Sequence, residues 1–203
     1  KDFEKLNHNY PSVITVGTFD GIHLGHQQLI KKVIQVSKAE QLKSIVLTFD
    51  PHPRSVLENS KNISLLNTFQ EKENILTPFG LDFLVKKKFT EEFSKMSSVD
   101  FVKNILIDRL NLKHLVIGHD HHFGRNRTAN ISQLMKYSKQ YDFKVTQVDA
   151  FKLNGISVSS TKVRNLIKDG NIDEANRFLG YNMFLSGTVV TGKGRGKKMG
   201  FPT

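Results

Sequence analysis

The stretch that decides the fold runs from Ser12 to His26 and reads SVITVGTFDGIHLGH. Its first part, Val13 to Val16, is a short apolar run typical of a strand buried on both faces. From Leu24 onward the apolar residues change to helical spacing, so the stretch predicts a strand, a turn with glycines and the start of a helix. The turn then lies at the carboxyl end of a strand, where open α/β sheets bind their ligands.

The turn and the helix start have the properties of a phosphate-binding site. The first turn of a helix presents unpaired N–H groups and the positive end of the helix dipole to an anion. Gly17, Gly21 and Gly25 allow close approach of the backbone, and His23 and His26 are spaced so that both imidazoles can face one phosphate chain. A tight turn with two surface histidines is the simpler alternative, but the combined pattern favours the phosphate site.

The rest of the chain alternates between strand and helix patterns. Strands are expected at 44–49, 81–89, 114–118 and 143–148, and helices at 24–40, 99–110, 131–141, 159–167 and 171–179. A strand, helix, strand order implies parallel pairing, because a parallel connection needs a crossover. The sequence therefore predicts an α/β fold with a Rossmann-like doubly wound parallel sheet.

Composition limits the class of protein. The chain has 203 residues, 30 basic and 19 acidic side chains, a formal net charge of +11 and no cysteine. The lack of cysteine excludes disulfides and thiolate metal sites, and no apolar run approaches the ~20 residues of a membrane span. With no signal peptide at its start, the chain is expected to be cytoplasmic and without a membrane partner. The positive charge would attract polyanions such as nucleic acid or a nucleoside triphosphate, but the scattered lysines favour an ordinary solvated surface over a nucleic-acid-binding one.

Residues 17–26, GTFDGIHLGH, resemble the G-x-F-D-G-x-H-x-G-H signature of the bacterial FAD synthetases, which belong to the H-x-G-H nucleotidylyltransferases. The H-x-G-H core is shared with other adenylyl- and cytidylyltransferases, so other motifs must decide the acceptor. Transfer of an adenylyl group requires positioning and stabilisation of charge on phosphoryl oxygens, which a donating or protonated histidine supplies. The resemblance implies catalytic roles for His23 and His26. It also implies nucleotide binding by Gly17, Thr18, Phe19, Asp20, Gly21 and Gly25.

Residues 158–164, VSSTKVR, place hydroxyl groups at an expected helix start and an arginine one turn later, which suits a triphosphate. An ordinary serine N-cap with exposed basic residues is the alternative. The segment is similar to the family's second nucleotide motif, I-S-S-T-x-x-R, with Val158 in place of isoleucine. The resemblance implies that Ser159, Ser160 and Thr161 bind phosphates and that Arg164 is catalytic.

Two further motifs of the resemblance concern the flavin. Residues 49–53, FDPHP, are similar to the family's F-x-P-H-P loop, and residues 118–127, GHDHHFGRNR, resemble its G-x-D-F-x-F-G-x-x-R segment. The sequence departs from the family at His121, where Phe is usual, and at Ala129, where Gly is usual. A metal cluster at 119–122 is the alternative, but neighbouring residues at a strand end point in alternate directions. The resemblance implies flavin contacts from Pro51, His52, Pro53, Asp120, Phe123 and Arg127.

The character of the sequence changes after Tyr181. Residues 184–190 have β character, and 192–200 are rich in glycine with four positive charges and no acid. Residues 187–193, GTVVTGK, fit the start of a P-loop, but Gly194 stands where that loop needs Ser or Thr. Residues 187–203 instead resemble the opening of the riboflavin kinase module, a small β-barrel, with Lys197 for arginine and Met199 for leucine. We expect a nucleotidylyltransferase domain at 1–181 and, at 182–203, the incomplete start of a kinase domain with its first strand.

Together the motifs predict an FMN adenylyltransferase, which transfers AMP from ATP to FMN and releases FAD and pyrophosphate, with Mg²⁺ as cofactor. Phosphorylation of riboflavin is expected only from a full-length chain with the complete kinase module. A nucleotidylyltransferase for another phosphorylated acceptor and a basic nucleic-acid-binding domain are the alternatives. The sequence leaves the magnesium ligands and the oligomeric state open.

Overall fold

The computed structural model describes residues 1–6, 9–57, 64–119 and 130–201. Its centre is a sheet of five parallel strands in the order β3-β2-β1-β4-β5. The strands are β1 (Ser12–Val16), β2 (Lys43–Asp50), β3 (Phe83–Lys88), β4 (Leu112–Gly118) and β5 (Lys144–Val148). The chain runs outward from β1 to β3 and then crosses to β4, so the switch point of a doubly wound sheet lies beside β1. The predicted fold class is confirmed.

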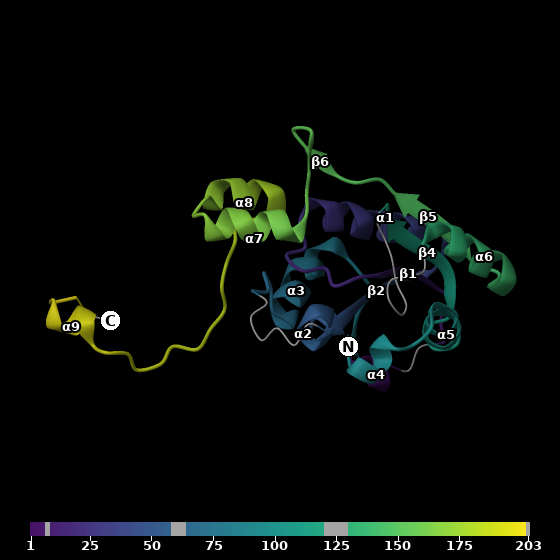
Figure 1. The fold of residues 1–203 in the computed structure, drawn as a ribbon, viewed down its shortest axis with the longest axis horizontal. Helices are drawn as coiled ribbons and strands as arrows, with labels where there is room; N and C mark the ends of the chain where they lie inside the picture. Colours follow the sequence, from purple (N-terminus) through teal and green to yellow (C-terminus); the bar gives the residue numbers. More distant parts are fainter. Residues whose placement is uncertain (7–8, 58–63, 120–129, 202–203) are drawn as a thin grey trace.

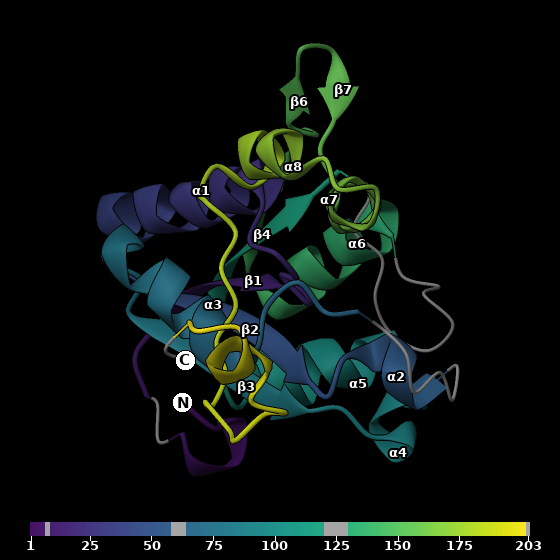
Figure 2. The ribbon, with the colours of Figure 1, turned by 90° about the vertical axis from the view of Figure 1, so that its left-hand side faces the viewer.

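Helices cover both faces of this sheet (Figure 1 and Figure 2). The α-helices are α1 (Leu24–Glu40), α2 (Pro53–Leu57), α3 (Phe69–Leu76), α4 (Glu91–Ser94), α5 (Ser98–Asp100), α6 (Ile131–Tyr141), α7 (Ser160–Lys168), α8 (Ile172–Leu179) and α9 (Arg195–Lys198). The other helical segments are η1 (Phe3–Lys5), η2 (Thr77–Phe79) and η3 (Phe101–Ile107). Successive strand residues point to opposite faces, so Ile14 packs with η3 and α6 while Val13 packs with α1. No helix among the described residues is long and apolar enough to cross a membrane.

Most predicted elements are confirmed to within two residues at either end, but the helix expected at 99–110 is different. It begins as α5 and continues as the π-helix η3, in which the Asp108 N–H donates to the Lys103 carbonyl at 2.9 Å. Its buried residues include Phe101, Val102 and Ile105. A spacing of one and then three residues fits a turn of either helix type, so the pattern does not distinguish them.

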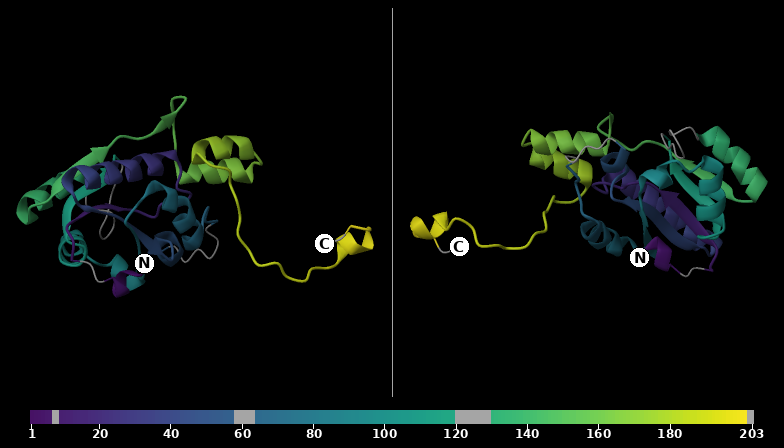
Figure 3. Two further views of the ribbon diagram at one scale, coloured as in Figure 1. Left: turned by 180° about the vertical axis from the view of Figure 1, so that it is seen from behind. Right: turned by 60° about the horizontal axis from the view of Figure 1, so that its bottom comes forward.

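The strand expected at 184–190 is wrong for the described chain, because this segment has no regular structure. A strand needs partners for its backbone N–H and C=O groups, and no described strand pairs with it. Figures 1 and 3 show the chain beyond α8 extending away from the sheet to α9. Before it, α7 and α8 pack on a small apolar cluster that includes Val163 and Phe178. A hairpin of β6 (Lys152–Leu153) and β7 (Ile156–Ser157) projects near them (Figure 2).

Candidate active site

The loop between β1 and α1 has an unusual backbone. Phe19 has φ 47° and Ile22 has φ 36°, in the left-handed region that residues with a Cβ rarely adopt. Such residues cost about 1–3 kcal/mol each and persist only where the surroundings hold them. Gly21 favours glycine, because its φ of 82° strains other residues and a Cβ there would lie 2.5 Å from Leu66 Cδ1, so that the Leu66 side chain would have to move. The shape of the loop is therefore imposed by its neighbours.

Groups from distant parts of the chain hold this loop. Lys72 Nζ on α3 and Thr48 Oγ1 on β2 donate to the Thr18 carbonyl at 2.8 and 3.1 Å. The Tyr181 hydroxyl, just after α8, donates to the Gly21 carbonyl at 2.8 Å. Burial raises the pKa of Tyr181 to about 12, so its hydroxyl keeps its proton at neutral pH. These partners lie between 30 and 160 positions away in the sequence.

Asp20 is the point where the two predicted nucleotide motifs meet. Its side chain is buried, and its Oδ2 forms an ion pair with Arg164 of α7. Its Oδ1 accepts the backbone N–H groups of Leu66 at 3.0 Å and Asn67 at 3.3 Å, and the Ser160 hydroxyl donates to the Asp20 carbonyl at 2.9 Å. A buried carboxylate requires such partners. Residues 17–26 and 158–164 are therefore brought together, as a shared role in nucleotide binding requires.

The start of α7 uses its hydroxyl groups for structure. Ser159 is the N-cap, and its Oγ accepts a backbone N–H of the first turn at 3.3 Å, which is the simpler role weighed from the sequence. Ser160 holds the loop, while Thr161 is exposed. Arg164 also donates through Nε to the Ser64 carbonyl at 2.9 Å, so these contacts use two of its five N–H donors. Phosphate binding by these residues stays a prediction.

His23 and His26 lie side by side at the first turn of α1. Their rings are stacked, with centroids 3.6 Å apart and planes 17° apart. His23 is the N-cap, and its Nδ1 accepts the His26 backbone N–H at 3.3 Å. Nδ1 of His26 is buried and has no hydrogen-bond partner within the described ranges. Since His23 is buried and His26 is partly buried, these are not the surface histidines of the simpler alternative.

The surroundings keep His26 neutral. Burial lowers the pKa of His26 well below its ordinary value of 6.5, and the nearby charges of His23 and Lys72 lower it further. Burial also lowers the pKa of His52, with Asp20 opposing the shift and Lys72 adding to it. A neutral imidazole donates a hydrogen bond from one ring nitrogen. His26 is therefore suited to hydrogen-bond donation at neutral pH and not to a permanent positive charge.

Lys72 contacts the predicted nucleotide loop, and sequence reasoning does not find it. It is only 6% exposed, and burial lowers its pKa. The sequence just before Lys72 contains a T-x-x-E pattern, Thr68 to Glu71, which forms a capping box and indicates the start of α3. A lysine in the first turn of a helix is ordinarily solvated, so nothing in the sequence predicts its burial. Asn67, which accepts from the Tyr181 hydroxyl at 3.2 Å, belongs to none of the sequence motifs and is also not found.

The predicted flavin residues are described only in part. Pro51, His52 and Pro53 lie where β2 ends and α2 begins, next to the loop at the end of β1. An aromatic cluster lies beside them, with Phe89 at 5.6 Å from both Phe49 and Phe93 between ring centroids. Asp120, Phe123 and Arg127, with the family departures His121 and Ala129 and most of the alternative metal cluster at 119–122, lie outside the described residues.

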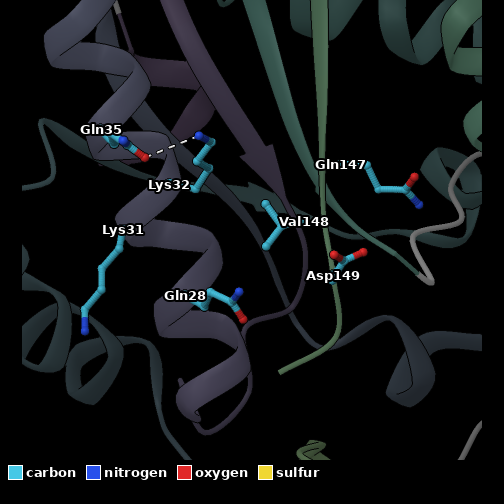
Figure 4. A pocket seen from close by; sticks show the side chains of 7 residues that line it. All are labelled: Gln28, Lys31, Lys32, Gln35, Gln147, Val148 and Asp149. Carbon is cyan, nitrogen blue, oxygen red and sulfur yellow. Dashed lines mark hydrogen bonds between the residues drawn. The ribbon is translucent and has the colours of Figure 1, made fainter. Parts of the chain in front are cut away.

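A groove of about 570 Å³ lies between α1 and the end of β5 (Figure 4). It is lined by Gln28, Lys31, Lys32, Gln35, Gln147, Val148 and Asp149. Lys32 donates to Gln35 across one turn of α1 at 3.3 Å, so part of this lining is already hydrogen-bonded. The groove contains none of the predicted site residues, and we do not assign the nucleotide to it.

Comparison with known proteins gives matches along the chain. The family model of FAD synthetase matches residues 5–162, and that of riboflavin kinase matches residues 179–203. The bifunctional riboflavin kinase/FMN adenylyltransferase of Buchnera aphidicola subsp. Schizaphis graminum is 36% identical over 203 residues, which are all of this chain and 64% of that protein. The FAD synthetase of Listeria monocytogenes is 32% identical over 183 residues, which are 90% of this chain and 74% of that protein.

A solved structure has the same fold along nearly the whole chain. It is a crystal structure described as a macrolide-efflux protein from Streptococcus pneumoniae, with a TM-score of 0.85 and 29% sequence identity. The match covers 98% of this chain and 65% of that one. The chain thus spans less than two thirds of this protein and of the Buchnera relative.

Proposed function

The chain belongs to the FAD synthetase family, and from this premise we propose that it transfers AMP from ATP to FMN, giving FAD and pyrophosphate. The observation that carries the proposal is the meeting of residues 17–26 and 158–164 through the ion pair between buried Asp20 and partly exposed Arg164. The stacked rings of His23 and His26 lie at the same helix start. This arrangement supports an anion site at the switch point of the sheet.

In the proposed reaction a phosphate oxygen of FMN attacks the α-phosphorus of ATP. A new P–O bond forms, the bond to pyrophosphate breaks, and negative charge develops on the leaving oxygen, so positioning and charge stabilisation are the main requirements. We assign hydrogen-bond donation to the phosphates to neutral His26, with His23 stacked beside it as the N-cap. The free N–H groups of the first turn of α1 also stabilise negative charge on the phosphates. Arg164 supplies positive charge from α7.

We propose that the nucleotide is bound by the backbone of the loop rather than by its buried side chains. Phe19 and Asp20 are buried, so their part is to set the shape of the loop. The full predicted set is Gly17, Thr18, Phe19, Asp20, Gly21, Gly25, Ser159, Ser160 and Thr161. For the flavin we propose Pro51, His52 and Pro53 as one wall, beside the cluster of Phe49, Phe89 and Phe93, with Asp120, Phe123 and Arg127 proposed from the family resemblance alone.

Mg²⁺ is part of the proposal because it neutralises phosphate charge in this chemistry. Within the described ranges no group of three or more His, Asp or Glu side chains forms a metal site. Mg²⁺ in nucleotide sites keeps several waters and binds substrate phosphates with one or two carboxylates, so a protein cage is not required. Asp20 is engaged by Arg164 at hydrogen-bond distance, whereas Asp50 is exposed at the carboxyl end of β2, with Lys86 Nζ 3.7 Å away, and fits such a role.

For the whole protein we propose a second activity, phosphorylation of riboflavin to FMN, in a domain that begins near residue 182. The match of the riboflavin kinase model to residues 179–203 supports it. The FMN made by that domain is the acceptor for the adenylyl transfer proposed here. We also propose a cytoplasmic location and no nucleic-acid or membrane partner.

The test is to mix the chain with FMN, ATP and Mg²⁺ and to follow flavin fluorescence and released pyrophosphate. We expect fluorescence to fall as the adenine of FAD stacks on the flavin, with equimolar pyrophosphate. Turnover with another phosphorylated acceptor and none with FMN would replace FMN as the substrate. Oligonucleotide binding with a steep salt dependence and no response to ATP would favour a nucleic-acid-binding domain instead.

A further inference from the structure

Lys72 is a buried cation at the end of the sheet where β1 meets α1. The lysine is only 6% exposed, although it stands on the first turn of the short helix α3. Removing an ammonium group from water is costly unless it is paired or hydrogen-bonded. Among the residues that the structure describes, its hydrogen bond is the one to the Thr18 carbonyl at 2.8 Å. The fold therefore keeps a positive charge directly against the loop of residues 17–26.

The carboxylates near Lys72 are bound to other groups. Asp20 is paired with Arg164 and with backbone N–H groups, and Asp50 lies 3.7 Å from Lys86 Nζ. Both carboxylates act on Lys72 only through space. The charge of Lys72 is consequently less neutralised than that of Arg164, and it adds to the positive field at this edge of the sheet.

The Thr18 carbonyl accepts hydrogen bonds from two side chains, one charged and one neutral. Lys72 Nζ donates from α3 and the uncharged Thr48 Oγ1 donates from β2. Thr18 immediately precedes Phe19, whose φ of 47° has to be held by its surroundings. The two donors therefore share the work of fixing the loop, while only one of them contributes charge. Comparing the loss of Lys72 with the loss of Thr48 therefore distinguishes a structural role of the lysine from an electrostatic one.

We propose that Lys72 is a positioning residue for adenylyl transfer: it fixes the Thr18 carbonyl and supplies a fixed positive charge at the loop that takes the triphosphate of ATP. The inference rests on the proposed function and extends it to a residue outside the family motifs quoted for this chain. Its substrate class is the anionic nucleoside triphosphate with Mg²⁺. Its neighbours on the site side are Asp20 from the loop, Asp50 from β2, His26 from α1 and His52.

The experiment compares Lys72→Met with Thr48→Val in the whole chain. Each removes one donor to Thr18, but only the first removes charge. Lys139→Met, on the exposed side of α6, removes the same charge far from the loop. We expect Lys72→Met to weaken binding of ATP with Mg²⁺, measured by calorimetry, by about tenfold or more, through loss of the local positive field. The two comparison variants are expected to change it by less than about threefold.

A second measurement is NMR titration of the His26 imidazole. Its neighbours His23 and Lys72 both carry or take up positive charge, so loss of Lys72 is expected to make His26 easier to protonate and to move its titration to higher pH. Thr48→Val leaves the charge in place and is expected to leave this titration unchanged. Equal ATP affinity and equal His26 titration in Lys72→Met and Thr48→Val overturn the proposal, because the lysine is then only a structural donor.

Two further comparisons keep the test decisive. If Lys72→Met does not fold, Lys72→Gln replaces it, because glutamine is a polar donor without charge. Weaker ATP binding by Lys72→Gln supports the proposal, and unchanged binding overturns it. Wild-type chain that binds ATP but makes no FAD refutes the proposed function, while the binding and titration arms still judge Lys72. Wild-type chain that makes FAD, with Lys72→Met equal to Thr48→Val, refutes the Lys72 proposal alone.

Discussion

Two segments of this chain carry clear sequence patterns, yet only one of them has a defined shape set by contacts. In the loop of residues 17–23, Phe19 is 2% exposed, and hydrogen bonds from α3, β2, α7 and Tyr181 hold the loop. In residues 182–194, Leu185 is 82% and Val189 98% exposed, and there is no regular structure. Hydrogen bonds from Met183 and Ser186 tie the start of this segment to α8 and α3.

The difference shows that a local pattern becomes structure only where the rest of the chain supplies partners. The loop keeps two non-glycine residues at positive φ, because buried hydrogen bonds outweigh the local cost. The β-prone C-terminal segment lacks a neighbouring strand among the described residues and therefore gains nothing from an extended hydrogen-bonded ladder.

Breaking the anchor at Asp20 is expected to have the largest effect. Asp20→Ala leaves the Arg164 guanidinium unpaired and frees the N–H groups of Leu66 and Asn67. Loss of one partner of a buried pair costs about 3–5 kcal/mol, and because Arg164 is 21% exposed we expect a fall near the lower end of this range in the free energy of unfolding, with loss of FAD formation. Urea denaturation measures it, with exposed Asp108→Ala as control. Equal stability of the two variants would show that the loop does not depend on this anchor.

The second prediction concerns His26, on the first turn of α1 directly after the loop. His26→Ala is expected to lower turnover by about 10²-fold, because charge on the phosphates loses a donor in the transition state, with a smaller effect on flavin binding. Steady-state kinetics with FMN and ATP, alongside fluorescence titration of FMN, measure both quantities. Near-normal turnover would remove His26 from the catalytic assignment.

Gly21→Ala tests whether backbone at positive φ is held more tightly in the packed loop than at an exposed turn. The change combines strain at φ 82° with a Cβ 2.5 Å from Leu66 Cδ1, and we expect a loss of about 1–3 kcal/mol in unfolding free energy. Gly155→Ala is the matched control, since Gly155 has φ 79° but nothing within 4 Å of the added Cβ. Thermal unfolding should show a larger loss for Gly21→Ala. A loss no greater than in the control would mean that the loop adapts easily.

Stability is expected to fall as the pH decreases from about 7.5 toward 5. The pKa of His26 lies below its ordinary value of 6.5 in the folded chain, so the unfolded state takes up the proton first. The free energy of unfolding does not depend on this group above the pKa of His in the unfolded chain. Below that pKa it falls by about 1.4 kcal/mol per pH unit until the pKa of His26 in the folded chain is reached. His52 and His114 shift in the same direction. Urea midpoints across this range should give a shallower slope for His26→Gln than for the wild type, and an identical slope would contradict a lowered pKa of His26.

The smallest effect is expected in the C-terminal segment. Val189→Ser changes a side chain that is 98% exposed, so we expect the unfolding free energy of this chain to change by less than about 0.5 kcal/mol. Val46→Ser, in the buried centre of β2, is the contrasting variant and should be strongly destabilising. A large loss from Val189→Ser would show that residues 182–194 are packed in solution.

Much of the fold follows from residue spacing alone. The apolar runs around Val13 and Ile45 predict strands, and the periodicity after Leu24 predicts α1 to the residue. The position of His23 and His26 at a helix start, at the carboxyl edge of the sheet, follows from the same patterns. The π-helical register of η3 does not, because its buried residues fit an α-helix equally well.

What the sequence by itself determined is the order and type of the five sheet strands and of the helices α1, α6, α7 and α8, the family, and the side chains that its motifs carry. Those properties depend on spacing within about 20 residues, which a single chain displays directly. Only the tertiary structure decided that Asp20 is a buried brace for Arg164, that His26 is kept neutral, and that Lys72 lies under the loop. These facts arise from partners many positions apart, whose meeting depends on how the strands and helices pack.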